Sequence, residues 1–131
     1  MVDGSFDPLH DGHITYFREA RELGNLVLCN IAPESWTAKK HPVLLSAEKR
    51  ALVLDAIKWI DFVHISQTST VDVLMEARPT VYAKGLDWRE RGLPIEEVEV
   101  CRALGIEIRF VGSQQNSSTL LVENLVSRST E

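Results

Sequence analysis

The chemistry of this chain is concentrated in two histidines near its start. They stand three residues apart in the run G-S-F-D-P-L-H-D-G-H, residues 4–13, with a glycine between them. A helical pattern follows the run, so His10 and His13 should lie at the N-terminus of a helix. The unpaired N–H groups and the positive dipole end of such a helix favour anions. Two potentially cationic imidazoles at this position predict a site for a phosphate chain.

The residues around the two histidines fit the same interpretation. We expect Gly4 to permit a turn that a side chain would obstruct, and Gly12 to let phosphate oxygens approach backbone N–H groups. Ser5 and Phe6 belong to the same run and are included in the predicted binding loop. The alternative is that Phe6 and its neighbours only pack a turn, with the histidines as surface residues.

Three later segments supply further candidates. Two lysines can neutralise an anion, a segment after a predicted strand can contact a bound ligand, and three hydroxyl residues can begin a helix that holds phosphates. Each segment also has a simpler explanation, as solvated charge, a chain-turning glycine or ordinary helix caps. In chain order, the candidates are Lys39 and Lys40; Lys84, Gly85, Asp87 and Trp88; and Ser117, Ser118 and Thr119.

The composition is that of an ordinary globular protein. The chain has 131 residues, 44% hydrophobic and 25% charged, which suits a single domain over residues 1–131. Its net charge of −5 argues against a general nucleic-acid binder, which would normally show a basic face. No apolar stretch reaches the length of about 20 residues that spans a bilayer, so no membrane partner is expected.

The cysteines and the N-terminal sequence predict a cytoplasmic protein. Cys29 and Cys101 have apolar neighbours and no metal-ligand spacing, so they are expected to be buried free thiols in a reducing compartment. No signal peptide precedes the first motif. Because so few residues precede Gly4, either the first strand is very short or the chain was cut from a longer polypeptide.

Strand-like runs alternate with helical patterns along the chain. Alternating strands and helices predict an α/β fold, a doubly wound parallel sheet of five strands with helices on both faces. Ligands of such sheets bind outside the carboxyl ends of the strands, where the candidate residues fall. The strands are expected at residues 1–3, 25–32, 62–65, 80–83 and 106–111, the last with the alternation of an edge strand.

Caps and helix breakers predict the helix boundaries. Serine, threonine and asparagine favour helix starts, proline favours the first turn, and glycine favours the position after the last turn. The expected helices are residues 14–23 before Gly24, 47–60 after Ser46, a short helix begun by Ser69 or Thr70 and stopped before Pro79, a helix from Pro94 to Leu104 before Gly105, and a last helix capped by Asn116 or Ser117.

The run at residues 4–13 resembles the GxFDxxHxGH signature of the cytidylyltransferase-like nucleotidyltransferases. These adenylyl- and cytidylyltransferases share a Rossmann-like α/β fold and use the HxGH histidines on the nucleotide phosphates. Lys39 and Lys40 lie where the family has a flexible lysine-bearing loop. Residues 82–88, Y-A-K-G-L-D-W, resemble its (V/M)-x-G-x-D-W segment, and residues 117–119, S-S-T, resemble the start of its final helix.

Two branches of the family are most similar, glycerol-3-phosphate cytidylyltransferase and the nucleotidyltransferase domain of the bifunctional ADP-heptose synthases. The resemblance implies transfer of CMP or AMP from CTP or ATP to a phosphorylated sugar or polyol, with pyrophosphate released by direct in-line attack. Glycerol-3-phosphate and choline-phosphate cytidylyltransferases carry an arginine before the last helix, where residues 112–118 here read G-S-Q-Q-N-S-S. This difference argues against glycerol 3-phosphate and choline phosphate as the acceptors of this chain.

The resemblance also implies roles for the candidate residues. His10 and His13 would stabilise charge on the α- and β-phosphates, while Lys39 and Lys40 would neutralise the acceptor phosphate. Residues 84–88 would contact the nucleoside, and the hydroxyls of residues 117–119 the outer phosphates. Mg²⁺ is expected to accompany the nucleoside triphosphate without a dedicated protein metal site. A homodimer is also expected, with apolar residues within 93–100 available for its interface.

Several alternatives stay open at this point. The F-D-P tripeptide also occurs in pantetheine-phosphate and nicotinate-mononucleotide adenylyltransferases, so one alternative is an adenylyltransferase of a cofactor precursor. A second is a nucleotide-binding domain without catalysis, and a third is an interaction module within a longer enzyme. The residues do not distinguish CTP from ATP, because backbone groups can read either base.

Overall fold

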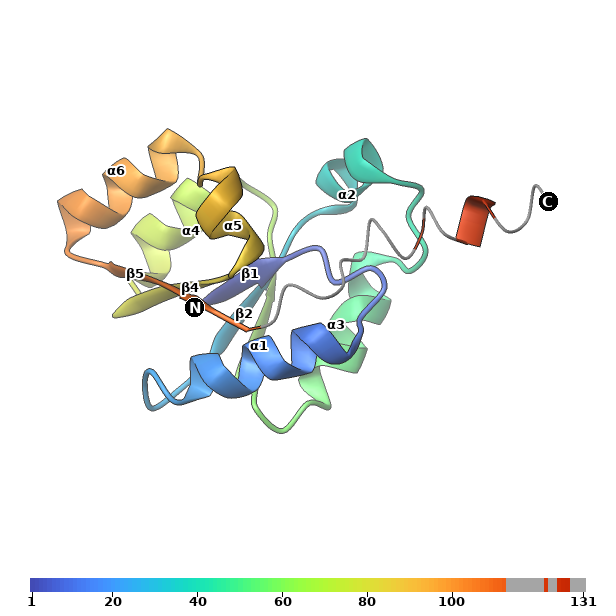
Figure 1. The fold of residues 1–131 in the computed structure, drawn as a ribbon, viewed down its shortest axis with the longest axis horizontal. Coiled ribbons are helices and arrows are strands. Elements are labelled where there is room, and N and C mark those ends of the chain that lie inside the picture. Colours follow the sequence, from blue (N-terminus) through green and yellow to red (C-terminus); the bar gives the residue numbers. More distant parts are fainter. Residues whose placement is uncertain (113–121, 123–124, 128–131) are drawn as a thin grey trace.

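The computed structural model describes residues 1–112, 122 and 125–127, whose central feature is a parallel sheet flanked by helices (Figure 1). The strand order is β3-β2-β1-β4-β5, and every pairing is parallel. This confirms the predicted five-stranded α/β sheet of Rossmann-like type. The strands are β1 Val2–Gly4, β2 Leu28–Ile31, β3 Phe62–Ile65, β4 Val81–Gly85 and β5 Glu107–Val111.

Helices cover both faces of the sheet, as the alternating pattern predicts. Helices α1 and α3 lie on one face, and α4 and α6 lie on the other (Figure 1). Phe17 of α1 and Leu54 of α3 belong to one apolar core, while Leu74 of α4 and Cys101 of α6 belong to the second. The helices are α1 Asp11–Arg21, α2 Glu34–Lys40, α3 Ala47–Asp55, α4 Thr70–Ala77, α5 Asp87–Arg91 and α6 Ile95–Leu104.

The order of the strands creates a crevice at the carboxyl ends of the strands, where a ligand can bind. From the central β1 the chain moves outward through β2 to β3, and then crosses back to β4 and β5 on the other side. Connections leaving β1 and β4 at their carboxyl ends therefore run in opposite directions. Such a reversal opens a crevice between the two strands, which is the usual ligand site of this architecture.

Several local helix signals are confirmed by the structure, although α1 ends with Glu22 as its C-cap, two residues before the predicted Gly24. Ser46 and Ser69 each accept a hydrogen bond from a backbone N–H in the first turn of the following helix, at 3.3 and 3.2 Å. Pro94 precedes α6, and Gly105 ends it with a φ of +71°, a conformation that suits glycine. The last predicted helix start lies outside the described residues.

Several predicted boundaries were wrong by a few residues. The second strand begins at Leu28 instead of residue 25, because its partner β1 begins only at Val2, which pairs with Cys29. Strand β4 continues to Gly85, two residues beyond its predicted end. Helix α1 ends at Arg21 and α3 at Asp55, each before its predicted end. Beyond α3, apolar residues continue into the core as turns, which periodicity alone does not separate from a helix.

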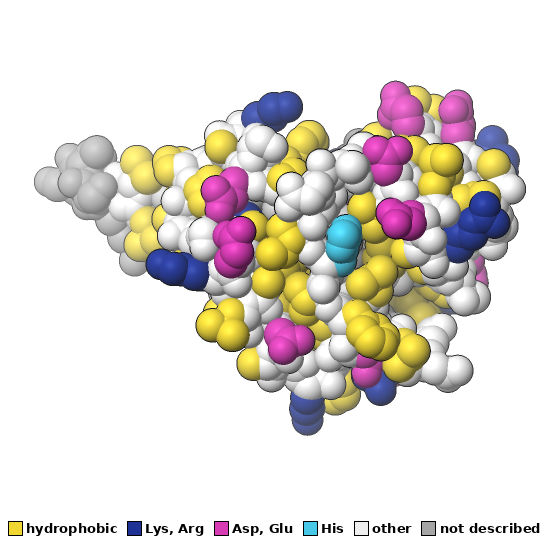
Figure 2. Space-filling model, turned by 180° about the vertical axis from the view of Figure 1, so that it is seen from behind, with side chains coloured by type: hydrophobic (Ala, Val, Ile, Leu, Met, Phe, Trp, Pro, Cys, Tyr) yellow, Lys and Arg dark blue, Asp and Glu magenta, His cyan; other side chains and the backbone are white. Residues whose placement is uncertain are grey.

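The surface of the described residues matches the acidic composition. On the face seen in Figure 2, acidic groups are scattered among apolar side chains, and the basic groups on that face form no continuous surface. Within the described part of the chain, no helix has the length and hydrophobicity needed to cross a membrane. In the segment expected at a dimer interface, Ile95 is 61% exposed, whereas Leu93 and Val100 pack against the core. The homodimer stays a prediction.

The two cysteines are buried and free, as the sequence predicts. Cys29 lies in β2 and Cys101 in α6, in different cores of the molecule. Burial raises the pKa of both thiols, so neither is a thiolate at neutral pH. Their role is packing.

The loops that follow β1 and β2 are joined by a buried cation, Arg50 of α3, which is only 1% exposed. Its guanidinium donates to the backbone carbonyls of Ser5 and Ala32 at 2.6 and 3.2 Å, and to that of Leu45 at 3.1 Å. The fully buried Asp7 carboxylate accepts two backbone N–H groups of the α2–α3 connection at 2.7 and 2.9 Å. These charged hydrogen bonds hold the loop that carries the histidines against α3.

We expect Arg50→Met to lower the free energy of unfolding by about 3 kcal/mol, because buried carbonyls and the Asp7 carboxylate lose a charged neighbour. Urea denaturation followed by circular dichroism measures this change. The matched control is Arg18→Met on the exposed side of α1, which should change stability by less than about 0.5 kcal/mol. Equal effects of the two substitutions would contradict the structural role of Arg50.

Candidate active site

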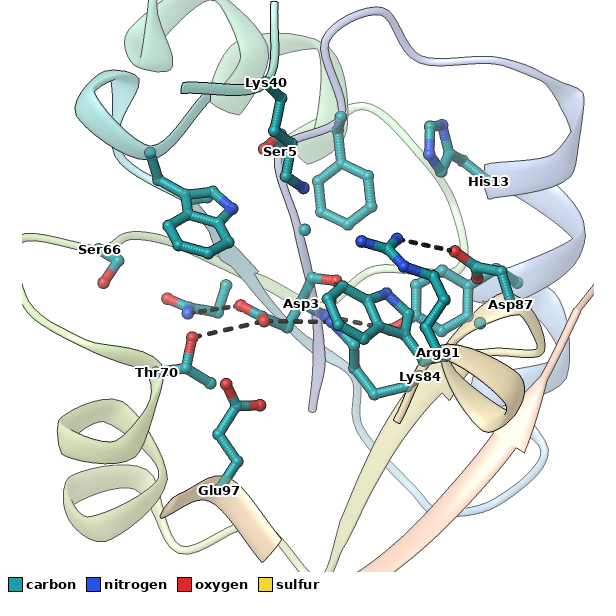
Figure 3. A pocket seen from close by; sticks show the side chains of 18 of the residues that line it. Asp3, Ser5, His13, Lys40, Ser66, Thr70, Lys84, Asp87, Arg91 and Glu97 are labelled. Atoms are coloured by element: carbon teal, nitrogen blue, oxygen red, sulfur yellow. Dashed lines mark hydrogen bonds and ion pairs between the residues drawn. The ribbon is translucent and has the colours of Figure 1, made fainter. Parts of the chain in front are cut away.

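A cavity of about 400 Å³ opens at the carboxyl ends of β1, β2 and β4, where the strand order reverses (Figure 3). Most of the predicted site residues line it, although they come from segments far apart in the sequence. Lys39 is not among the lining residues, and Ser117, Ser118 and Thr119 lie outside the described residues. The predicted residues in the lining are Gly4, Ser5, Phe6, His10, Gly12, His13, Lys40, Lys84, Gly85, Asp87 and Trp88.

The two histidines are fixed by the backbone at the start of α1. His10 is the N-cap residue, and its Nδ1 accepts the N–H of Gly12 at 3.1 Å. The N–H of His10 in turn donates to Nδ1 of His13 at 3.2 Å. The rings stack with centroids 3.8 Å apart. Because both Nδ1 atoms accept hydrogen bonds, each ring must carry its proton on Nε2.

Both imidazoles are neutral, which corrects the expectation of two cationic rings. Burial lowers the pKa of His10, and burial together with the neighbouring His10 lowers that of His13 to about 3. Phe6 and Phe17 lie against the His13 ring, with centroids 5.1 and 6.4 Å away. The Nε2 of His10 is buried and has no hydrogen-bond partner among the described residues. The pair therefore offers neutral N–H donors to a ligand.

The turn that presents the histidines depends on a close approach of Phe6 to Gly4. Phe6 adopts a φ of 54°, in the left-handed region that non-glycine residues rarely enter. A Cβ on Gly4 would lie 3.0 Å from the end of the Phe6 ring. Gly4 is the last residue of β1, directly before the turn, and a side chain there would obstruct the turn, as the sequence predicts. Its lack of a side chain makes room for the buried aromatic ring that supports His13.

The cavity gathers three cationic side chains from three elements, Lys40 of α2, Lys84 of β4 and Arg91 of α5. Lys84 and Arg91 lie against the Trp88 ring, 4.6 and 4.3 Å from its centroid. The pKa of Lys40 is lowered by burial and then by repulsion from Lys84 and Arg91. Because these three cations repel one another, their gathering in one cavity favours an anionic ligand.

The predicted lysine loop is part of a helix. Lys39 and Lys40 form the last turn of α2, and each ammonium lies near the Trp36 ring, 5.9 and 5.5 Å from its centroid. Only Lys40 lines the cavity, because successive residues of a helix point in different directions. The prediction of a flexible loop at this position was therefore wrong.

A second close approach to a glycine lies at the end of β4. A Cβ on Gly85 would lie 2.8 Å from Oδ1 of Asp87, so a side chain here would displace that carboxylate. Asp87 also forms an ion pair with Arg91 at 3.6 Å, marked by a dashed line in Figure 3. Lys84 and Gly85 belong to β4, although the pattern predicted a loop for both. Lys84 is only 4% exposed.

A polar part of the cavity was not predicted from the sequence. These residues do not belong to the recognised motifs, and their side chains meet only in the folded chain. Their positions in the sequence could have indicated them, since most of them lie within or directly after strands or at the start of a helix. The missed lining residues that carry charge or hydrogen-bonding groups include Asp3, Tyr16, Asn30, Ser66, Thr70, Arg91 and Glu97.

Asp3 is the centre of this missed region. Its carboxylate accepts the side-chain N–H of Asn30 at 2.9 Å and forms an ion pair with Lys84 at 3.4 Å. The hydroxyl of Thr70 donates to it at 3.5 Å, and the Tyr82 hydroxyl, which donates its proton to Glu97 at 2.6 Å, lies 3.3 Å from it. Asp3 therefore joins the end of β1 to β2, β4 and α4.

Side chains typical of a protein metal site do not cluster in the described part of the chain. No group of three or more histidine, cysteine, aspartate or glutamate residues there could hold a metal ion.

A family model described as Cytidylyltransferase-like matches residues 1–124. The chain belongs to this family. The match covers the two histidines, the cationic residues and the region around Asp3, so it includes the whole described cavity. It also confirms the family resemblance that the sequence motifs indicate, and with it a domain of nucleotidyltransferase type.

Individual relatives agree with this assignment. The bifunctional protein HldE of Pseudomonas aeruginosa (strain LESB58) is 31% identical over 129 residues, which are 93% of this chain and 26% of that protein. The chain thus spans about a quarter of this relative. FAD synthase of Archaeoglobus fulgidus is 34% identical over 88 residues, 66% of this chain and 64% of that enzyme.

A solved structure has the same fold. The lipopolysaccharide core biosynthesis protein from Thermoplasma volcanium GSS1 superposes with a TM-score of 0.74, covering 88% of this chain and 96% of that chain. The sequences are 23% identical, so this similarity concerns the fold.

We expect acid to destabilise the protein through His13. Its pKa is near 3 in the folded chain and about 6.5 when exposed, so between these values the unfolded chain binds more protons. The free energy of unfolding should therefore fall by up to about 1.4 kcal/mol for each unit of pH lost in this window. Urea denaturation at several pH values should show a shallower loss for His13→Gln than for the wild type.

The matched control for this pH effect is His64→Gln, since His64 lies exposed on β3. This control should keep the wild-type dependence of stability on pH. Identical dependences for the wild type and His13→Gln would contradict a neutral His13 in the folded protein.

Proposed function

We propose that the chain transfers a nucleotidyl group, CMP or AMP, from CTP or ATP to a phosphorylated sugar or polyol, with release of pyrophosphate. The observation that carries this proposal is the neutral pair His10 and His13, which opens into the same cavity as Lys40, Lys84 and Arg91. Directed donors beside converging cations suit a reaction that moves negative charge between phosphates.

The proposed step needs no protein base. A phosphate monoester is already an oxyanion at neutral pH, since its second pKa is about 6. One of its oxygens attacks the α-phosphorus of the triphosphate and forms a new P–O bond. The bond from the α-phosphorus to the oxygen shared with the β-phosphorus breaks, and pyrophosphate leaves with those electrons. The protein must align the two phosphates and stabilise the moving charge.

The residues can be assigned to these tasks. His10 and His13 would donate from Nε2 to oxygens of the α- and β-phosphates as negative charge develops. Lys40 would neutralise the acceptor phosphate, and Lys84 with Arg91 would hold the phosphates in line. Asp87 and Trp88 of α5 would contact the nucleoside, and the hydroxyls of residues 117–119 would hold the outer phosphates.

Mg²⁺ would enter as part of the substrate. The described residues form no metal cluster, so the ion would be held by oxygens of the triphosphate and arrive as the magnesium–nucleotide complex. Its charge would partly neutralise the phosphates that the three cations attract.

A second candidate is adenylyl transfer to a phosphorylated cofactor precursor. The observation that favours it is the 34% identity to an FAD synthase. This reaction uses the same bond changes and the same phosphate contacts, and it differs in the organic part of the acceptor. An acceptor panel therefore separates the two candidates.

We expect pyrophosphate to form when the protein is incubated with Mg²⁺, one nucleoside triphosphate and a phosphorylated sugar or polyol. The preferred nucleotide should also raise the melting temperature, because a ligand at about 100 times its Kd adds about 2.7 kcal/mol of stability. Comparing CTP with ATP in both assays identifies the base. Stabilisation by a nucleotide without pyrophosphate from any acceptor would identify a binding domain and contradict the proposed transfer.

We expect His13→Ala to lower kcat by about 100-fold to 1,000-fold, the usual effect of removing one donor to a developing negative charge. His64→Ala is the matched control and should keep the wild-type rate. Circular dichroism and thermal melting should show a folded His13→Ala protein. A folded variant with turnover within about tenfold of the wild type would remove His13 from the mechanism.

A further inference from the structure

The cavity continues beyond the proposed phosphate contacts into a second polar region. In Figure 3, Ser66, Thr70 and Glu97 lie on one side of Asp3, and His13 lies on the other side. The members of this region come from β1, β2, α4, α6 and the connection after β3. We call the set Asp3, Asn30, Ser66, Thr70 and Glu97 the far subsite.

Hydrogen-bond donors of the far subsite are already used within the protein. The side-chain N–H of Asn30 and the hydroxyl of Thr70 donate to Asp3, and the Ser66 hydroxyl donates to a backbone carbonyl at 2.6 Å. The hydroxyl of Tyr82 donates to Glu97 Oε1 at 2.6 Å. A ligand that binds here therefore finds few protein donors.

Acceptors of the far subsite remain available. Asn30 is only 1% exposed, and its Oδ1 is buried without a hydrogen-bond partner among the described residues. No donor in the described part of the chain bonds the second carboxylate oxygen of Glu97. A buried acceptor without a partner costs free energy, which a ligand donor would recover. The ligand group at this position must donate hydrogen bonds.

The charged side chains around the far subsite indicate which kind of hydrogen-bond donor the ligand carries. The carboxylate of Asp3 is balanced by Lys84 at 3.4 Å, and Lys40 and Arg91 line the same cavity. An ammonium group would meet these cations, while a carboxylate would meet Asp3 and Glu97. A hydroxyl group donates without a net charge and avoids both penalties.

We propose that Asn30 and Glu97 of the far subsite accept hydrogen bonds from hydroxyl groups of the acceptor, and so select among the phosphorylated sugars and polyols of the proposed function. This inference rests on the proposed nucleotidyl transfer. In this assignment Asn30 and Glu97 determine specificity, because they accept hydrogen bonds from the hydroxyls of the phosphorylated substrate. Asp3 holds the Asn30 side chain in place. This assignment also favours sugar and polyol phosphates over acceptors whose organic part is apolar or cationic.

The test compares acceptors that differ in the group placed in the far subsite. Glycerol 3-phosphate and a hexose 1-phosphate carry hydroxyls, propyl phosphate carries none, and phosphoethanolamine carries an ammonium. We expect the better polyhydroxyl acceptor to exceed the other two by at least about tenfold in kcat/KM, as sites that hydrogen-bond a hydroxyl reject analogues without it. Comparable rates with propyl phosphate would overturn the far subsite and leave the proposed transfer intact.

A variant with nearly the same shape tests the assignment of Glu97. Glu97→Gln keeps an oxygen for the Tyr82 hydroxyl and replaces the free acceptor by an N–H donor. We expect about a tenfold higher KM for the polyhydroxyl acceptor from this loss, with the KM for the nucleotide within about twofold of the wild type. Glu96→Gln, on the exposed side of the same helix, is the matched control and should leave both KM values unchanged. An unchanged acceptor KM in a folded Glu97→Gln protein would overturn the assignment.

Binding measurements separate this inference from the proposed function. If no acceptor gives pyrophosphate, the proposed transfer fails, and calorimetry then measures whether glycerol 3-phosphate or the hexose 1-phosphate binds. Tighter binding of either ligand than of propyl phosphate, lost in Glu97→Gln, would support the far subsite. Equal or absent binding of all these ligands would overturn it.

Discussion

The site depends on how the backbone at the start of α1 satisfies its hydrogen-bond donors. Two of these N–H groups donate to histidine rings, Gly12 to His10 and His10 to His13. Since each bond occupies Nδ1, it also decides where the proton of each ring lies, and burial lowers the pKa of both rings so that they are neutral. The same hydrogen bonds that cap the helix therefore leave each histidine with an Nε2–H donor of fixed direction.

Neutral histidines require that the charge of the site come from elsewhere. Lys40, Lys84 and Arg91 reach the cavity from α2, β4 and α5, so three elements contribute to one electrostatic field. In the proposed reaction this separates two tasks, because the cations attract the phosphates and the histidines orient them. In the far subsite the Asp3 carboxylate forms an ion pair with Lys84, which leaves a region of low net charge there.

The precision of the site is supported by buried groups at its base and beneath its loops. Arg50 joins the loops after β1 and β2, and Asp7 fastens the histidine loop to the segment before α3. Gly4 contributes by lacking a side chain, since Phe6 occupies the space that a Cβ would take. These contacts explain how a central strand as short as β1 can hold a functional loop in place.

Local features of the molecule could be predicted from the sequence, because their causes lie within a few residues. Helix caps such as Ser46 and Ser69 depend on hydrogen bonds to the next turn, and the alternation of strands and helices is encoded in apolar periodicity. The order of these elements led to the parallel sheet, and the motif around His10 and His13 led to the family.

Tertiary structure alone decided which distant side chains meet and which charges they carry. Asp3, Asn30, Arg91 and Glu97 stand in four separate segments, and only the register of β1 with β2 and the crossover to β4 bring them into one cavity. The neutral state of His13 likewise follows from burial, which no local pattern reports. The sequence by itself determined the helix start that holds the histidines, while packing determined their protonation and their neighbours, because desolvation and long-range contacts arise only when the chain is folded.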